Sequence, residues 1–166
     1  MKTTLIGAAI VAAVTFTQAA NAQNTASASF LASANIVSPI AIVNNGPMSF
    51  GDVVPGTSAG SVVLAAAGGR TPSGVTLGGS TSWSAATFTV TGAPNYAYSI
   101  GLPGSVTINS GGNSMTVASF TSNPTGPGNL GSGGTQALAV GATLSVGASQ
   151  AVGFYTGSFN VTVTYN

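Results

Sequence analysis

Few side chains in this sequence could take part in chemistry, and the first candidate is a serine. Residues 56–60, GTSAG, match the G-x-S-x-G pattern of hydrolase nucleophiles, with Ser58 at its centre. Such a serine needs a neighbouring base to accept its proton. The chain has no histidine, and its only lysine, Lys2, falls in the N-terminal segment described below. The sequence therefore predicts a turn at residues 56–60 rather than a nucleophile.

A second pattern is that of a dinucleotide-binding turn. Residues 126–131, GPGNLG, match G-x-G-x-x-G, which binds a pyrophosphate only between a strand and the first turn of a helix. The residues that follow, 132–134, do not begin a helix. We predict a flexible loop here.

Acid–base and metal chemistry lack the residues that they require. One acidic residue is present in the whole chain, whereas glycosidases use a pair of carboxylates. Protein metal sites draw on several His, Cys, Asp or Glu side chains, and the chain has no His and no Cys. The sequence predicts a protein that is not an enzyme and that needs no cofactor.

The N-terminus predicts export. Lys2 is followed by an apolar run over residues 5–16 and by the small-residue tripeptide Ala20-Asn21-Ala22, which is the pattern of a secretory signal peptide. The run is shorter than the ~20 residues of a membrane-spanning helix. We expect residues 1–22 to be the signal peptide and residues 23–166 to form one domain without a transmembrane segment. The expected localisation is the periplasm in transit, then the cell surface or the medium.

The expected mature chain is almost uncharged. Its only charged side chains are Asp52 and Arg70, which we predict to form a structural ion pair or to anchor turns. Soluble monomers usually carry many charges, because a net charge near zero promotes association. No basic patch is present, so nucleic acid is excluded as a partner.

Alternation of apolar and polar residues predicts the elements. Such alternation with a period of two is typical of half-buried strands, and turn residues follow every 8 to 12 residues or so, as in all-β sandwiches. The fold class that we predict is an all-β antiparallel sandwich. Its strands are expected at residues 40–43, 48–50, 61–66, 75–77, 87–91, 96–100, 106–108, 115–120, 138–146 and 158–165.

The N-terminal part of the expected mature chain carries one further alternating segment. It is predicted to be a strand with small side chains on one face, namely Ala26, Ala28, Phe30, Ala32, Ala34 and Ile36. Two interpretations remain open. The segment is either the first strand of the domain itself, or a strand that is donated to another copy of the protein.

Aromatic side chains suggest an alternative function. Trp83, Tyr96, Tyr98, Phe154 and Tyr155 could build a platform on which a sugar ring stacks. The chain would then be a self-contained binding module, periplasmic or on the cell surface, for a neutral ligand such as a carbohydrate. The regular spacing of Tyr96 and Tyr98 favours core positions instead, which leaves Trp83 as the one exposed ring.

An ordered set of short motifs resembles a known family. It looks like the bacterial domain of unknown function 4402 family, and the match covers nearly the whole expected mature chain. The motifs are IVSPI at residues 36–40, MSFGD at 48–52, GRT at 69–71, GVTL at 74–77, ATFTVTG at 86–92, YSIGLP at 98–103, VGATL at 140–144 and GFYTGSFNVTVTY at 153–165.

The last of these motifs is also similar to the ending of chaperone-usher and spore-coat-type pilins. This resemblance implies an immunoglobulin-like sandwich that a strand from the next subunit completes. The acceptor groove would then contain Phe159, Val161, Val163 and Tyr165. The implied function is a structural subunit of a surface fibre or coat. Its implied partners are further copies or related subunits, a periplasmic chaperone and an outer-membrane usher.

Overall fold

The computed structural model describes residues 25–79 and 81–166, and these residues form strands, turns and extended segments. The predicted signal peptide, residues 1–22, lies outside the described residues. The chain divides into two units, Met1–Asn35 and Ile36–Asn166. All strands belong to the second unit. Nowhere in the described chain is there a helix long and apolar enough to cross a membrane.

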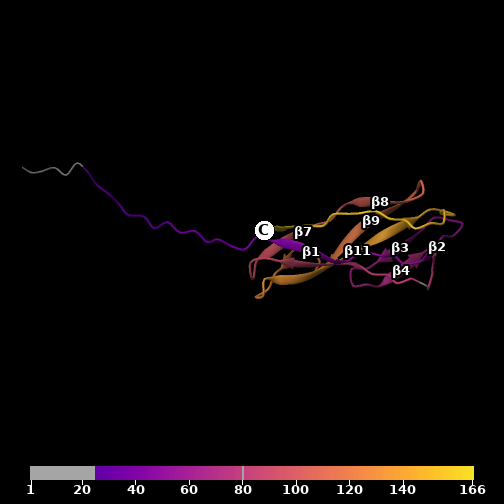
Figure 1. Ribbon diagram of the computed structural model, residues 1–166, viewed down its shortest axis with the longest axis horizontal. Helices are drawn as coiled ribbons and strands as arrows, with labels where there is room; N and C mark the ends of the chain where they lie inside the picture. The colour runs from indigo at the N-terminus through magenta and orange to yellow at the C-terminus, as the bar shows by residue number, and fades with distance from the viewer. Residues whose placement is uncertain (1–24, 80) are drawn as a thin grey trace, which may run out of the picture. The chain divides into compact units, whose positions relative to one another are not determined.

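The largest sheet has seven strands, all paired antiparallel (Figure 1). Five of them follow one another in the order β1, β6, β11, β3, β4. In addition, β9 pairs with β11, and β8 pairs with β9. Their bounds are Ala41–Gly46 for β1, Ala86–Thr91 for β6, Thr135–Val146 for β11, Gly60–Leu64 for β3, Arg70–Ser73 for β4, Asn113–Asn123 for β9 and Ser105–Ser110 for β8.

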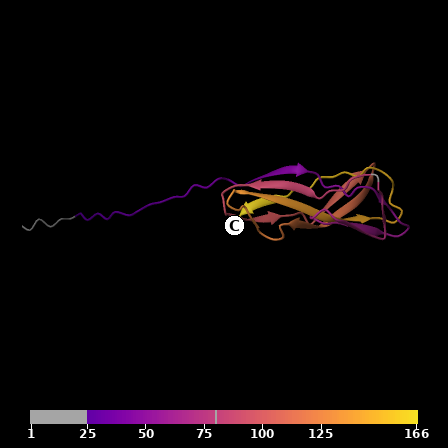
Figure 2. The same cartoon turned by 90° about the horizontal axis from the view of Figure 1, so that it is seen from below.

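Two smaller antiparallel sheets complete the second unit (Figure 2). One has three strands in the order β10 (Gly128–Asn129), β7 (Ala97–Gly101) and β12 (Thr162–Tyr165). The other pairs β2 (Val53–Val54) with β5 (Thr76–Leu77). The predicted all-β class with antiparallel sheets is therefore confirmed.

Strand β11 lies at the centre of the large sheet. Its first half pairs with β6 and its second half with β3, while β9 lies along its other edge. The register between β11 and β9 shifts between Gly141 and Thr143, and such a bulge bends a strand and increases its twist. The sheet therefore curls. Every second residue of β11 is buried as the alternation predicted, namely Leu138, Val140, Ala142, Leu144 and Val146.

The core consists of two apolar clusters, one on each half of β11. The first gathers around Tyr98 and Leu138, and the second around Val62 and Leu144. Tyr98 is fully buried, and its hydroxyl donates a hydrogen bond of 2.8 Å to Oε1 of Gln136. Desolvation by burial raises the pKa of the Tyr98 hydroxyl.

The N-terminal segment departs from the prediction of a strand in this chain. Residues 25–40 contain no strand, and β1 begins at Ala41. The interpretation that Ala26, Ala28, Phe30, Ala32, Ala34 and Ile36 form the domain's own first strand is therefore not what the structure shows. All six residues are exposed. Donation to another copy stays a prediction.

Candidate functional site

An apolar groove of about 750 Å³ runs between residues 47–55 on one side and residues 150–159 on the other. We call it the groove. Its floor comes from strands β8, β9 and β11 and is made of Val106, Ile108, Met115, Val117, Phe120, Leu144 and Val146. Apart from Val106, these side chains belong to or pack against the second core cluster. The groove therefore opens directly onto the hydrophobic core.

The chain on either side of the groove is short of strand pairing. Residues 47–52 form only one isolated bridge, from Ser49 to Ser84, and residues 147–161 form only one, from Thr156 to Asn109. Next to them, β1 ends the seven-stranded sheet and β12 ends the three-stranded sheet. Within the described residues, β1 pairs only with β6, and β12 pairs only with β7. The outer edges of β1 and β12 are therefore open to a further strand. The carbonyls of Pro47, Phe50 and Asp52, by contrast, accept hydrogen bonds from Ser84, Arg70 and Gly78.

Of the four predicted acceptor residues, Phe159 alone is among the residues that line the groove. Phe159, Val161, Val163 and Tyr165 are half-buried, and the residues between them are exposed, as the alternation predicted. All four pack against the first core cluster. The regular strand β12 begins only at Thr162, so the predicted strand over residues 158–165 is four residues long in this structure.

Tyr165 ties the end of the chain to the start of the domain. Its hydroxyl donates to the carbonyl of Ser38 at 2.8 Å and accepts from the amide of Ala93 at 2.6 Å. Its ring lies 5.4 Å from that of Tyr96. These contacts hold the residues that follow the N-terminal segment beside the end of β12. We call this region the C-terminal end of the domain.

The opposite end of the groove is held by a polar network. Gln150 donates from Nε2 to the hydroxyl of Tyr155 at 2.9 Å and accepts at Oε1 from the amide of Gly147 at 3.1 Å. The Tyr155 hydroxyl donates to the carbonyl of Ala151 at 2.8 Å. Residues 150–155 are thus fixed without forming a strand. We call this region the Gln150 end.

Arg70, one of the two charged residues that the structure describes, makes several hydrogen bonds to backbone carbonyls beside the groove. Its Nη1 donates to the carbonyls of Phe50 at 2.6 Å and Asp52 at 3.1 Å, and its Nη2 donates to that of Gly78 at 2.8 Å. The guanidinium carbon lies 4.4 Å from the centre of the Trp83 ring. Arg70 therefore joins the segment that borders the groove to two loops.

The structure brings the two predicted ion-pair partners together through the main chain. Arg70 bonds the carbonyl of Asp52, and the Asp52 carboxylate accepts a hydrogen bond of 2.6 Å from the Thr81 hydroxyl. An ion pair between the two side chains stays a prediction. Sequence reasoning missed the bonds from Arg70 to carbonyl groups, because a sequence does not show which carbonyls a fold leaves unpaired.

Replacing Arg70 by lysine tests these hydrogen bonds. A lysine ammonium is one point of charge and cannot span three carbonyls as the guanidinium does. We expect the Arg70→Lys variant to lose about 2 kcal/mol in the free energy of unfolding, since hydrogen bonds from charged donors contribute about 1.5–3 kcal/mol each. Urea denaturation followed by the fluorescence of Trp83, the only tryptophan, measures this change. A loss below about 0.5 kcal/mol would contradict the stabilising role of these hydrogen bonds.

The five aromatic residues of the predicted sugar platform do not come together as one surface. The Arg70 guanidinium lies over the Trp83 ring. The Trp83 Nε1 donates a hydrogen bond of 3.0 Å to the carbonyl of Gly68. Tyr98 is buried, while Phe154 and Tyr155 lie at the Gln150 end of the groove. Trp83 is 46% exposed, with the guanidinium over its ring. The prediction that it is the one exposed ring was wrong, because Phe154 is 87% exposed and Tyr96, expected in the core, is 39% exposed.

The two motifs that suggested chemistry lie in turns. Ser58 is exposed in a bend between β2 and β3. Residues 126–131 lead into further turns and no helix. The prediction of a flexible loop was wrong in one respect, because this stretch contains β10 and the fully buried Leu130. Among the described residues, no three His, Cys, Asp or Glu side chains come together to hold a metal.

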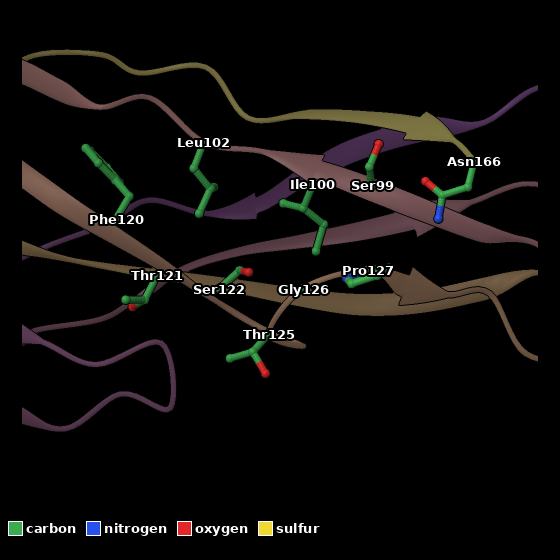
Figure 3. A pocket seen from close by; sticks show the side chains of 10 residues that line it. All are labelled: Ser99, Ile100, Leu102, Phe120, Thr121, Ser122, Thr125, Gly126, Pro127 and Asn166. Atoms are coloured by element: carbon green, nitrogen blue, oxygen red, sulfur yellow. The ribbon is translucent and has the colours of Figure 1, made fainter.

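A second, shallower pocket of about 480 Å³ lies where β7 faces the end of β9 (Figure 3). Figure 3 shows Ile100, Leu102 and Phe120 on one side of it and the loop carrying Thr125 and Gly126 on the other. Its lining carries no charged side chain. It is open, and its polar side chains are the hydroxyls of Ser99, Thr121, Ser122 and Thr125 and the amide of Asn166.

We compared the chain with known proteins, solved structures and protein families, and one family matches. No curated protein matches the chain, and no solved structure matches it. A family model described as "Domain of unknown function (DUF4402)" matches residues 40–165. The matched residues include both sides of the groove and exclude the alternating N-terminal segment. Because the match spans most of the chain, this protein belongs to the DUF4402 family.

Proposed function

We propose that this chain is a non-catalytic structural subunit of a bacterial surface fibre or coat, which assembles by β-strand addition. In this proposal the domain is an immunoglobulin-like sandwich that lacks one strand. Residues 26–36 of a second copy supply that strand by entering the groove. The observation that carries the proposal is a groove that opens onto the core and is bordered by segments with little strand pairing.

The chemistry of the N-terminal segment matches that of the groove. The donor face presents Phe30 and Ile36 among alanines, and both large side chains are almost fully exposed. The floor of the groove is apolar. Burying Phe30 and Ile36 would contribute about 1.5–3 kcal/mol each. The backbone of the donor would pair with the free edges, as in other cases of strand addition.

One of the other two end strands of the large sheet, β4, is better protected than β1. Strand β4 has four residues and contains Pro72, which lacks a backbone amide for pairing. Short edge strands that carry proline are a common defence against uncontrolled pairing. This contrast supports strand addition at the groove rather than at β4.

The near absence of charge also fits a polymer. No repulsion between like charges opposes the stacking of copies, and the contacts proposed here are apolar or made by the backbone. The assembled form should therefore depend little on salt concentration. A subunit with such a groove would need protection during export, so we propose a periplasmic chaperone and an outer-membrane usher as partners, besides further copies of the chain.

Gel electrophoresis of material sheared from producing cells tests the proposal. Samples in detergent are compared before and after boiling. We expect a ladder of multimers that collapses to a single band on boiling, because pairing along a whole strand resists detergent until it is heated. A single monomer band in both lanes, at good expression, would contradict the proposal and favour the self-contained binding module.

A further inference from the structure

We infer that Met48 and Met115 form an oxidation-sensitive modification site in the groove, where a peroxide converts both thioethers to sulfoxides and so prevents strand addition. The inference rests on the proposed function and adds to it a means of regulation at the same site. The form of the protein on which the oxidant acts is the subunit with a free groove, before a strand fills it.

The first observation is where the sulfur atoms lie. The chain has three methionines and no cysteine, and Met1 falls in the predicted signal peptide. The other two methionines, Met48 and Met115, both line the groove. Every sulfur-containing side chain of residues 23–166 therefore belongs to the surface that the proposed strand would cover.

The second observation is that both side chains are half-buried. Met115 lies on β9 and packs against the second core cluster. Met48 follows β1 and packs against both clusters. Each side chain keeps part of its surface in contact with water, and access from solvent is what an oxidant requires. A strand in the groove would remove that access.

The reaction transfers one oxygen atom to each sulfur. A lone pair of the thioether sulfur attacks one oxygen of hydrogen peroxide, and the O–O bond breaks. The hydroxide that leaves takes the proton from the transferred oxygen and becomes water. The sulfur is oxidised to a sulfoxide and the peroxide is reduced to water. A flexible apolar side chain thereby becomes a polar one.

The polar side chains at the Gln150 end are already engaged and do not wait for a sulfoxide. Gln150 donates from Nε2 to the carbonyl of Ser114 at 3.3 Å and to the hydroxyl of Tyr155 at 2.9 Å. The Tyr155 hydroxyl donates in turn to the carbonyl of Ala151. The floor of the groove is apolar. A strand that covers a sulfoxide would take it from water into apolar surroundings, which is unfavourable for a polar group without a hydrogen bond.

Oxidation of the separated full-length subunit with hydrogen peroxide tests the inference. Mass spectrometry of peptides should show one added oxygen atom at Met48 and one at Met115, and urea denaturation should show a subunit that is still folded. We expect the ladder of unboiled multimers to fall at least tenfold, which corresponds to about 1.4 kcal/mol. Methionine sulfoxide reductases for both epimers, supplied with a thiol, should remove the added oxygen and restore the ladder.

The double variant Met48→Leu with Met115→Leu is the matched control. Leucine has a volume close to that of methionine and is usually tolerated in its place, but it has no sulfur. After the same treatment this variant should keep its ladder. Equal loss of the ladder in the variant would overturn the inference, because the damage would then lie elsewhere.

The remaining outcomes separate this inference from the proposed function. Oxidised methionines with an undiminished ladder would overturn the inference and leave strand addition standing. Unfolding of the oxidised subunit, or methionines that the peroxide does not reach, would also overturn it. A chain that forms no ladder before oxidation would reject strand addition itself, and the inference with it. Recovery with the reductases uses the unmodified chain, so it decides the question even if the leucine variant fails to fold.

Discussion

The variant Phe30→Asp is expected to lose the detergent-resistant multimers, at least tenfold by band intensity. In the proposed assembly, Phe30 is the large side chain near the middle of the donated strand. A carboxylate in its place would have to enter the apolar groove, where no cationic side chain is among the lining residues. Burial of an unpaired charge costs several kcal/mol, and a tenfold change in an equilibrium requires only about 1.4 kcal/mol.

Leu31→Asp is the matched control for this variant. Leu31 is the adjacent residue and is 97% exposed, compared with 90% for Phe30, and it falls on the polar face of the alternating segment. Neither substitution touches the core, so both variants should unfold at the same urea concentration as the unmodified chain. We expect Leu31→Asp to keep its ladder. Equal loss in both variants would contradict a donor with one apolar face, and retention in both would contradict donation by this segment.

The variant Gly141→Ala is expected to lose about 3 kcal/mol in the free energy of unfolding. Gly141 lies at the register shift of β11 and is buried. A Cβ atom there would lie 2.5 Å from the amide nitrogen of Ala66 and 2.6 Å from the carbonyl carbon of Ala65, and it would also collide with the carbonyl oxygen of Leu64. Backbone cannot move aside as a flexible side chain does, and overpacking of this kind costs about 1–3 kcal/mol or more.

Gly104→Ala is the control for Gly141→Ala. A Cβ at Gly104 would meet nothing within 4 Å. The φ angle of Gly104 is not positive, so alanine can adopt it. We expect a change within about 0.5 kcal/mol there, since substitutions away from packed features are usually that small. Chemical denaturation of both variants, followed by Trp83 fluorescence, makes the comparison. An unchanged stability of Gly141→Ala would contradict the close approach of the 64–66 backbone to β11.

The absence of acid–base and metal-binding side chains follows from composition and needs no coordinates. The main strands follow from alternation, because a strand that is half buried must place apolar residues at every second position. Strands β6, β7, β9 and β11 therefore lie where the pattern predicted them, within a few residues at each end. The alternation of Phe159, Val161, Val163 and Tyr165 likewise predicted their half-buried positions.

Short elements were beyond the reach of the pattern. Strands β2, β5 and β10 have two residues each, too few to show a period, and β4 contains a proline that argues against a strand. Leu130 is fully buried inside a glycine-rich stretch. These positions depend on which distant segments lie beside them, and local sequence carries little of that information.

The sequence by itself determined the all-β class of the protein, its scarcity of ionisable side chains and the apolar face of each long strand. Only the tertiary structure decided which edges of the described strands stay unpaired, where the groove opens and that residues 25–40 form no strand. The physical reason is that alternation reports burial along one segment. Pairing, by contrast, depends on contacts between residues far apart in the sequence, such as the bond from Tyr165 to Ser38 and those from Arg70 to Phe50 and Gly78.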